Sequence, residues 1–156
     1  MSNVFLVIQD IVSIPFAKNL AFANLELLTH DNFVDAKPNF YDEARPAQID
    51  LRIRQELELY VVSITQAQAL ALLNFFIETK SLDESAIMIK RQACFDDALE
   101  ARGIHRLRSF EANSRLVHDN NAYTITSTYY DETLKLYIIH NIQASNIEVS
   151  PKYYMT

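Results

Sequence analysis

The chain has 156 residues, of which 49% are apolar and 22% charged, a composition typical of a single globular domain covering residues 1–156. Its net charge of −6 at pH 7 argues against a protein that coats nucleic acid with its whole surface, because nonspecific affinity comes mainly from Lys and Arg. No apolar run approaches the ~18 residues that span a bilayer, and no basic segment precedes the apolar N-terminal stretch. We therefore expect no membrane partner and an intracellular location, cytoplasmic or nuclear.

Glycine and cysteine each occur only once. Gly103 is the only glycine, where average usage of ~7% predicts about eleven. Turns that need a positive φ must therefore use Asn or Asp, or accept strain. Cys94 cannot form a disulfide within the chain, and its helical surroundings favour a small buried apolar side chain in a reducing compartment.

The first part of the chain predicts three elements. Residues 4–14 are apolar nearly all round and fit either a buried helix or a strand, which Pro15 ends. Residues 37–42 are typical of a short strand or of the end of one, because a proline favours an edge or a strand start. The pattern over residues 46–59 predicts a helix with Pro46 in its first turn and apolar residues at helical spacing.

A strand and a long helix are predicted in the middle of the chain. Residues 65–72 are good helix formers, yet they run directly into residues 73–77, which have the character of a strand. Residues 83–108 predict a helix that Asp83 caps and that Gly103 ends or bends. The apolar stripe expected on this helix comprises Ile87, Met88, Cys94, Phe95, Ala98, Leu99 and Ala101.

The last part of the chain changes to a period of two. Residues 123–130 and 133–139 alternate in this way and are joined by Asp131-Glu132, which predicts a β-hairpin. Asp-Glu is a poor two-residue turn, because Asp-Gly would supply the positive φ without strain.

A charged pair occurs at the end of the predicted strand, in the sequence Asn74-Phe-Phe-Ile-Glu-Thr-Lys80. Side chains alternate across a strand, so Glu78 and Lys80 lie on one face, about 7 Å apart at the usual rise per residue. A carboxylate there can bind Mg²⁺, and an ammonium beside it can orient the water that attacks a phosphodiester. The alternative is an ordinary ion pair on a strand that turns towards solvent.

Positive charge gathers on the predicted long helix, in an otherwise acidic protein. Its basic side chains are Lys90, Arg91, Arg102, His105, Arg106 and Arg108. They fit either an edge that contacts phosphates or a solvated helix flank whose arginines pair with nearby acids. Gln92 shares a helix face with apolar residues, so a polar amide points towards the apolar side or its edge. The tyrosines near the C-terminus could stack on bases, although alternating tyrosines usually pack within a sheet.

These stretches resemble successive blocks of a large family of uncharacterised fungal proteins, which in turn resembles the PD-(D/E)XK nucleases. The resemblance covers the chain from about residue 20 to its C-terminus and rests on five blocks: 38–46, 74–80, 90–102, 121–129 and 153–156. It implies an α/β fold with a restriction-endonuclease-like core, in which helices flank a central mixed sheet. It also implies a Mg²⁺ cofactor and DNA or RNA as a partner, whereas protein partners stay unknown.

The resemblance also assigns roles to particular residues. Glu78 and Lys80 match the acid and the lysine of the nuclease motif, and Gln92 matches a polar residue on the following helix that borders such sites. Glu78 would bind the metal together with Asn39 or Asp42. The basic residues expected to contact nucleic acid are Lys90, Arg91, Arg102 and Arg106.

The chain departs from the family pattern at the expected metal ligand. The family has Pro-Asp-Phe-Tyr-Asp-Gly where this chain has Pro38-Asn-Phe-Tyr-Asp-Glu43. Asn39 offers a neutral carbonyl oxygen in place of a carboxylate, and affinity for a hard cation follows the number of charged oxygens. Asp42 would point to the opposite face of a strand unless the chain turns there. The resemblance also leads us to expect a chain that spans less than the family's usual length.

Three functions are consistent with these residues. The first is a diverged nuclease-fold protein with a degenerate active site and impaired Mg²⁺-dependent phosphodiester cleavage. The second is a non-catalytic interaction or nucleic-acid-binding module of the same fold. The third is an ordinary α/β protein in which Glu78 and Lys80 form a surface ion pair.

Overall fold

The fold is mixed α/β, with helices packed against a mixed sheet of six strands. The computed structural model describes residues 16–28, 36–44, 46–63, 71–80, 85–111, 121–142 and 152–156. In chain order the elements are β1 (Phe16–Ala17), β2 (Phe40–Ala44), the 3₁₀ helix η1 (Pro46–Gln48), α2 (Leu51–Glu56), α3 (Glu58–Val61), β3 (Ala71–Thr79), α4 (Ala86–Glu111), β4 (Ala122–Tyr130), β5 (Thr133–Ile142) and β6 (Lys152–Met155). The predicted mixed sheet with flanking helices is therefore confirmed at this level.

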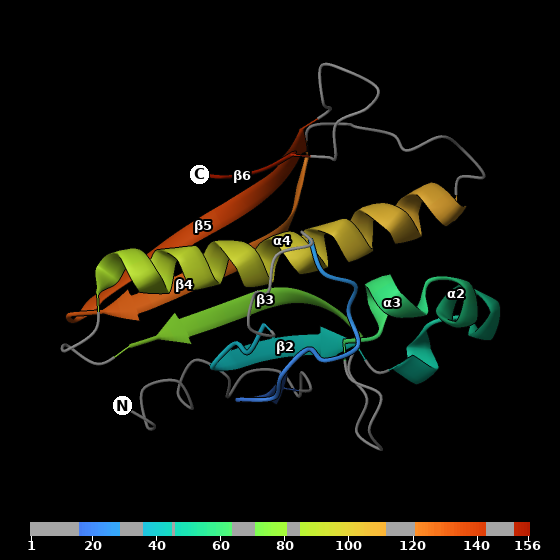
Figure 1. Cartoon of the computed structure of the whole chain (residues 1–156), viewed down its shortest axis with the longest axis horizontal. Helices are drawn as coiled ribbons and strands as arrows, with labels where there is room; N and C mark the ends of the chain where they lie inside the picture. The colour runs from blue at the N-terminus through green and yellow to red at the C-terminus, as the bar shows by residue number, and fades with distance from the viewer. Residues whose placement is uncertain are drawn as a thin grey trace.

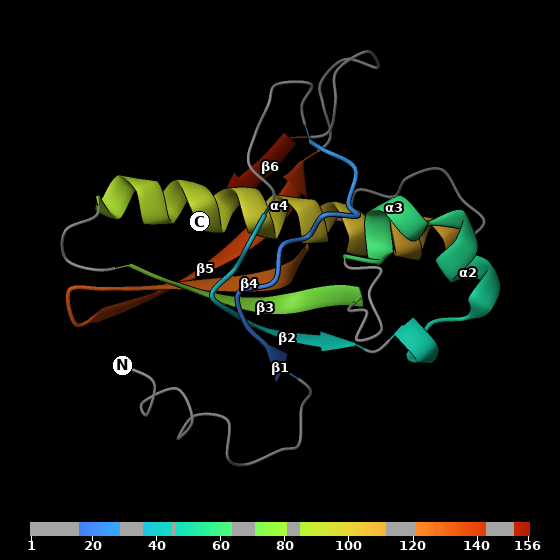
Figure 2. The ribbon, with the colours of Figure 1, turned by 60° about the horizontal axis from the view of Figure 1, so that its bottom comes forward.

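The strands lie in the sheet in their chain order, from β1 to β6. Only β3 and β4 pair in parallel, because α4 carries the chain back between them, and the other neighbours are antiparallel. Figures 1 and 2 show α4 lying along one face of the sheet, with α2 and α3 beside its C-terminal half. The helix α4 therefore covers this face of β3 and β4.

The core lies between α4 and this face of the sheet. Phe76 of β3 and Leu99 of α4 are buried together with Phe22 and Tyr41, whose rings meet edge to face at 5.5 Å between centroids. The helix predicted over residues 83–108 is present as α4, but its apolar stripe is shorter than expected. Ile87 is 64% exposed because it faces a groove and not the core, and Met88 is exposed as well.

Gly103 does not end α4 but lies within it, where it is buried beside α3. A Cβ atom at this position would lie 2.3 Å from the carbonyl oxygen of Tyr60. Glycine is therefore required here by the close approach of two helices and not by a turn.

Gly103→Ala is expected to lower the free energy of unfolding by about 1–3 kcal/mol, because the methyl group forces α3 and α4 apart. In an open helix position the same change would be favourable by nearly 1 kcal/mol. Urea denaturation measures the difference. Arg91→Ala, at an exposed site of the same helix, serves as the control and is expected to change stability by less than about 0.5 kcal/mol. A more stable Gly103→Ala variant would contradict the packing of α3 on α4.

The predicted hairpin is confirmed as β4 and β5, with Asp131 and Glu132 at its turn. Both residues have a positive φ, of 47° and 57°, as a two-residue turn of this hand requires. The chain therefore accepts the strain that a glycine would have avoided.

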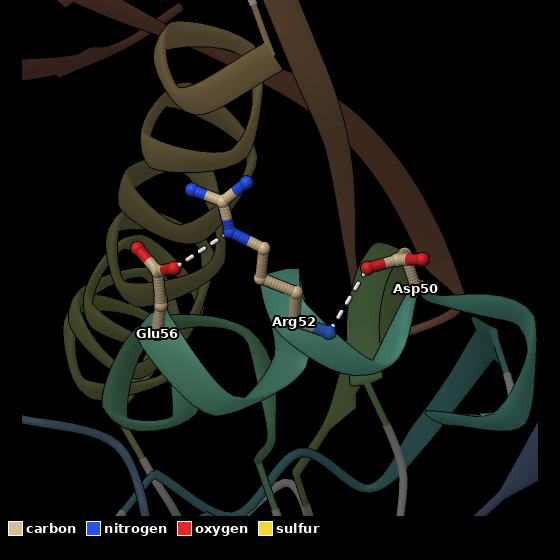
Figure 3. Close-up of polar contacts among 3 residues, drawn as sticks. All are labelled: Asp50, Arg52 and Glu56. Atoms are coloured by element: carbon tan, nitrogen blue, oxygen red, sulfur yellow. Dashed lines mark hydrogen bonds and ion pairs between the residues drawn. The ribbon is translucent and has the colours of Figure 1, made fainter.

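The helix predicted over residues 46–59 is present but divided into three pieces. Pro46 opens η1, and α2 begins only after Asp50, whose side chain accepts the Arg52 backbone N–H at 2.9 Å. Arg52 Nε in turn donates to Glu56 Oε1 at 2.9 Å (Figure 3). Leu57 separates α2 from α3.

Two predicted segments lie wholly or mainly outside the described residues. Residues 4–14 are among them, as are residues 65–70 of the stretch rich in helix formers. The last two residues of that stretch, Ala71 and Leu72, belong to β3, so the strand begins earlier than predicted. Leu72 has a positive φ of 52°, close to a register shift between β2 and β3.

Candidate functional site: a buried carboxyl pair

The start of β2 and the end of β3 meet beside each other in the sheet. Phe40 pairs with Ile77, which places the preceding residue, Asn39, next to Glu78 and Thr79. Asn39 Oδ1 accepts the Thr79 backbone N–H at 2.7 Å, and the Asn39 backbone N–H donates to the Glu78 carboxyl group. The segment that begins with Pro38 is therefore joined to the Glu78 region by hydrogen bonds.

The Glu78 side chain points from β3 towards α4. It is 2% exposed and reaches Asp96, which is 0% exposed. Gln92 Nε2 donates to Asp96 Oδ1 at 2.7 Å. Gln92 and Asp96 share a helix face because residues four apart lie one above the other on an α-helix. The strand and the helix thus bring two carboxyl groups and one amide together in the protein interior.

The Glu78 and Asp96 carboxyl groups face each other, and a hydrogen bond between two carboxyl groups requires a proton on one of them. No donor from another described residue reaches Glu78 Oε1 or Asp96 Oδ2, and ionised carboxylates are acceptors only. Burial raises the pKa of Glu78 to about 7, although Asp96, the charge of Lys80 and the Asn39 N–H each lower it. Burial also raises the pKa of Asp96 well above its usual range, and the negative charge of Glu78 adds to this effect. At neutral pH the pair therefore shares a proton.

Two further acids of α4 are buried close by. Glu100 lies one turn beyond Asp96, and its Oε1 accepts the Ser63 hydroxyl at 2.8 Å. Burial raises the pKa of Asp97 to about 7, which the Thr124 hydroxyl offsets only in part. Asp96, Asp97 and Glu100 were not among the predicted site residues. The spacing of four between Gln92, Asp96 and Glu100, within an otherwise apolar helix face, is the signal that could have identified two of them.

The structure brings together most of the residues that the nuclease motif predicts. Asn39, Glu78 and Gln92 all belong to the buried arrangement around Asp96. Lys80 follows β3 directly, is half-exposed, and its charge favours the ionised form of Glu78. The backbone of Asp42 pairs with Phe75, but its side chain lies outside what the structure describes.

The four basic residues predicted to contact nucleic acid do not form one surface. Lys90 and Arg91 are exposed on the N-terminal half of α4. Arg102 instead donates to the backbone carbonyls of Glu26 and Leu27. The Arg102 and Arg106 guanidinium groups lie 5.2 and 5.0 Å from the centroid of the Tyr60 ring. These two arginines thus connect α4 to α3 and to the segment around residue 26.

The donor groups around Glu78 do not fit a hydrated Mg²⁺ ion as they are arranged. No group of three or more His, Cys, Asp or Glu side chains that could hold a metal occurs within the described ranges. Asn39 Oδ1 is already occupied by the Thr79 N–H, which leaves the two enclosed carboxyl groups. Mg²⁺ usually keeps several of its waters, and such an enclosed site has little room for them.

The fold and the site together define a mixed α/β domain with a buried carboxyl pair between α4 and its sheet. No protein-family model, curated protein or solved structure matches the chain. Within the described residues, no helix is both long enough and apolar enough to cross a membrane.

Proposed function

We propose that this chain is a diverged domain of the PD-(D/E)XK type whose phosphodiester-cleaving site has closed around a shared proton. Mg²⁺-dependent nuclease activity is accordingly impaired. The observation that carries the proposal is the contact between Glu78 and Asp96 beside Asn39, at the junction of β2, β3 and α4.

The placement of the motif residues supports the nuclease-like part of the proposal. Position 39, where the resemblance implies an anionic ligand, lies beside Glu78, and Gln92 reaches the same place from the following helix. A mixed sheet flanked by helices is also what the resemblance implies.

The burial of the carboxyl pair supports the second part of the proposal, that nuclease activity is impaired. A nuclease of this type needs ionised carboxylates that a metal and a phosphate can reach. Glu78 is instead enclosed, and its pKa of about 7 leaves much of it protonated at neutral pH. Asn39 supplies no negative charge, and its oxygen is held by a backbone N–H.

A cleavage assay tests this function. Supercoiled plasmid, single-stranded DNA and RNA are incubated with Mg²⁺ or Mn²⁺ and either the wild-type chain or Lys80→Ala. We expect equal background cleavage from both proteins, because Lys80 has no metal-bound water to orient. A working site would lose about 10²–10⁴-fold in rate on removal of a residue that assists proton transfer. A wild-type rate at least 100-fold above that of Lys80→Ala would overturn impaired catalysis.

A second candidate function is a non-catalytic ligand-binding module of the same fold. The observation that favours it is a large groove beside α4, lined by lysines and tyrosines. Binding in this groove does not require the carboxyl pair to hold a metal.

A further inference from the structure

A groove of about 910 Å³ lies between the N-terminal half of α4 and the strands β4, β5 and β6. Pockets that enclose small ligands usually have volumes of about 300–1,000 Å³. Thr128 of β4 lines the groove and pairs in register with Glu78, so the groove begins next to the carboxyl pair. Its walls come from segments far apart in the sequence, which is why no local motif identified it.

The charge of the groove is opposite to that of the chain as a whole. Lys90, Arg91 and Lys135 line it and are exposed, whereas Asp131 is the only acidic residue among the described residues that line it. The chain carries a net charge of −6, so this local excess of cations needs a separate explanation. A groove with such an excess attracts anions, and more strongly at low salt.

The same groove also presents aromatic rings. Four tyrosines line it: Tyr130, Tyr137, Tyr153 and Tyr154. Tyr137 pairs in register with the buried Thr126, so its ring lies on the face of the sheet that α4 covers, whereas Tyr154 pairs with His140 and its exposed ring lies on the opposite face. The Lys90 ammonium lies 5.3 Å from the centroid of the Tyr137 ring, so a cation and an aromatic face occur side by side.

We propose that this groove binds an aromatic anion of nucleotide size, that is, a base joined to phosphate. The lysines and Arg91 would contact the phosphate, and the rings of Tyr130 and Tyr137 would stack on the base, as in proteins that bind unpaired nucleotides. The apolar part of the lining, which includes Ile87 and Met155, suits the flat face of a base better than a fully hydrated ion. This inference rests on the second proposed function and not on the first.

Binding is tested with the full chain in EDTA, so that the metal site plays no part. The probes are AMP, ATP and a fluorescent oligothymidylate, measured by calorimetry or by fluorescence anisotropy. We expect saturable binding that weakens with salt, at least tenfold weaker binding by Lys90→Glu combined with Lys135→Glu, and weaker binding by Tyr137→Ala. The matched control is Lys18→Glu together with Lys37→Glu, an equal change of charge at exposed lysines outside the groove.

The probes separate two sources of the same ligand chemistry. Binding of AMP or ATP identifies a free nucleotide, and binding of the oligomer alone identifies a single strand. Absence of binding by every probe, or equal loss in the groove variant and in the control, overturns the inference. Circular dichroism confirms that each variant is folded. Tyr137→Ala, which removes a ring of the groove and changes no charge, keeps the test decisive if the double charge reversal does not fold.

Discussion

Glu78→Gln is expected to stabilise the protein by about 1–3 kcal/mol near pH 8 and to change its stability little near pH 5. The buried Glu78 carboxyl has a pKa of about 7, against an ordinary value of 4.5. The folded chain therefore binds more protons than the unfolded chain between these values, and its free energy of unfolding falls as the pH rises from about 4.5 to about 7. Glutamine resembles the protonated acid in shape and remains neutral, so the variant avoids the penalty at high pH.

Urea denaturation at several pH values measures this difference. Glu58→Gln, at an exposed site of α3, is the control and is expected to change stability equally little at both extremes. Asp97 also has a pKa raised to about 7 by burial, so Glu78→Gln reduces the pH dependence without abolishing it. Asp97→Asn should remove a separate part of the pH dependence of stability. Lower stability of Glu78→Gln near pH 8 would show that the Glu78 carboxylate is stabilised by a cation.

Asn39→Asp is expected to make the stability of the chain depend on Mg²⁺, which the wild-type chain should not show. The new carboxylate would keep the Thr79 N–H as a partner and would stand beside Glu78. Without a divalent cation, a further negative charge next to the carboxyl pair should lower stability by about 1–3 kcal/mol. A cation that binds only the folded state reverses this loss by mass action.

Thermal unfolding with increasing Mg²⁺ measures the effect. Asn39→Ala serves as the matched control, because it also removes the acceptor for Thr79 but adds no charge. It should be less stable than the wild type and insensitive to Mg²⁺. If Asn39→Asp does not respond to Mg²⁺, position 39 was never a ligand position, and the nuclease relationship loses its main structural support. If the wild type responds as strongly as the variant, its site already holds the cation.

Much of the fold could be predicted from the sequence, because the periodic segments are long. The period of two around Asp131-Glu132 predicted the hairpin, and the helical spacing from residue 83 onward predicted α4. The break at Leu57 and the role of Gly103 could not be predicted, because both depend on how α3 packs against α4. A single glycine in a helical pattern has the same local signal whether it ends the helix or admits a neighbour.

Only some residues of the candidate site could be predicted from the sequence. Glu78, Lys80 and Gln92 stand out as polar residues in apolar surroundings, but Asp96 was not among the predicted site residues. Its importance comes from the tertiary contact between α4 and β3, which places it against Glu78. The separation of Arg102 and Arg106 from Lys90 and Arg91 likewise depends on α3 and Tyr60, which lie far away in the sequence.

The protonation state of the pair tests the central claim most directly. Carbon-13 NMR of the Glu78 and Asp96 carboxyl groups can be followed against pH, with and without millimolar Mg²⁺, and assigned with Glu78→Gln and Asp96→Asn. A shared proton predicts that at least one carboxyl signal titrates near neutral pH and that Mg²⁺ leaves the curve unchanged. Two carboxylates that are fully ionised by about pH 5, with signals that Mg²⁺ shifts, would contradict the account.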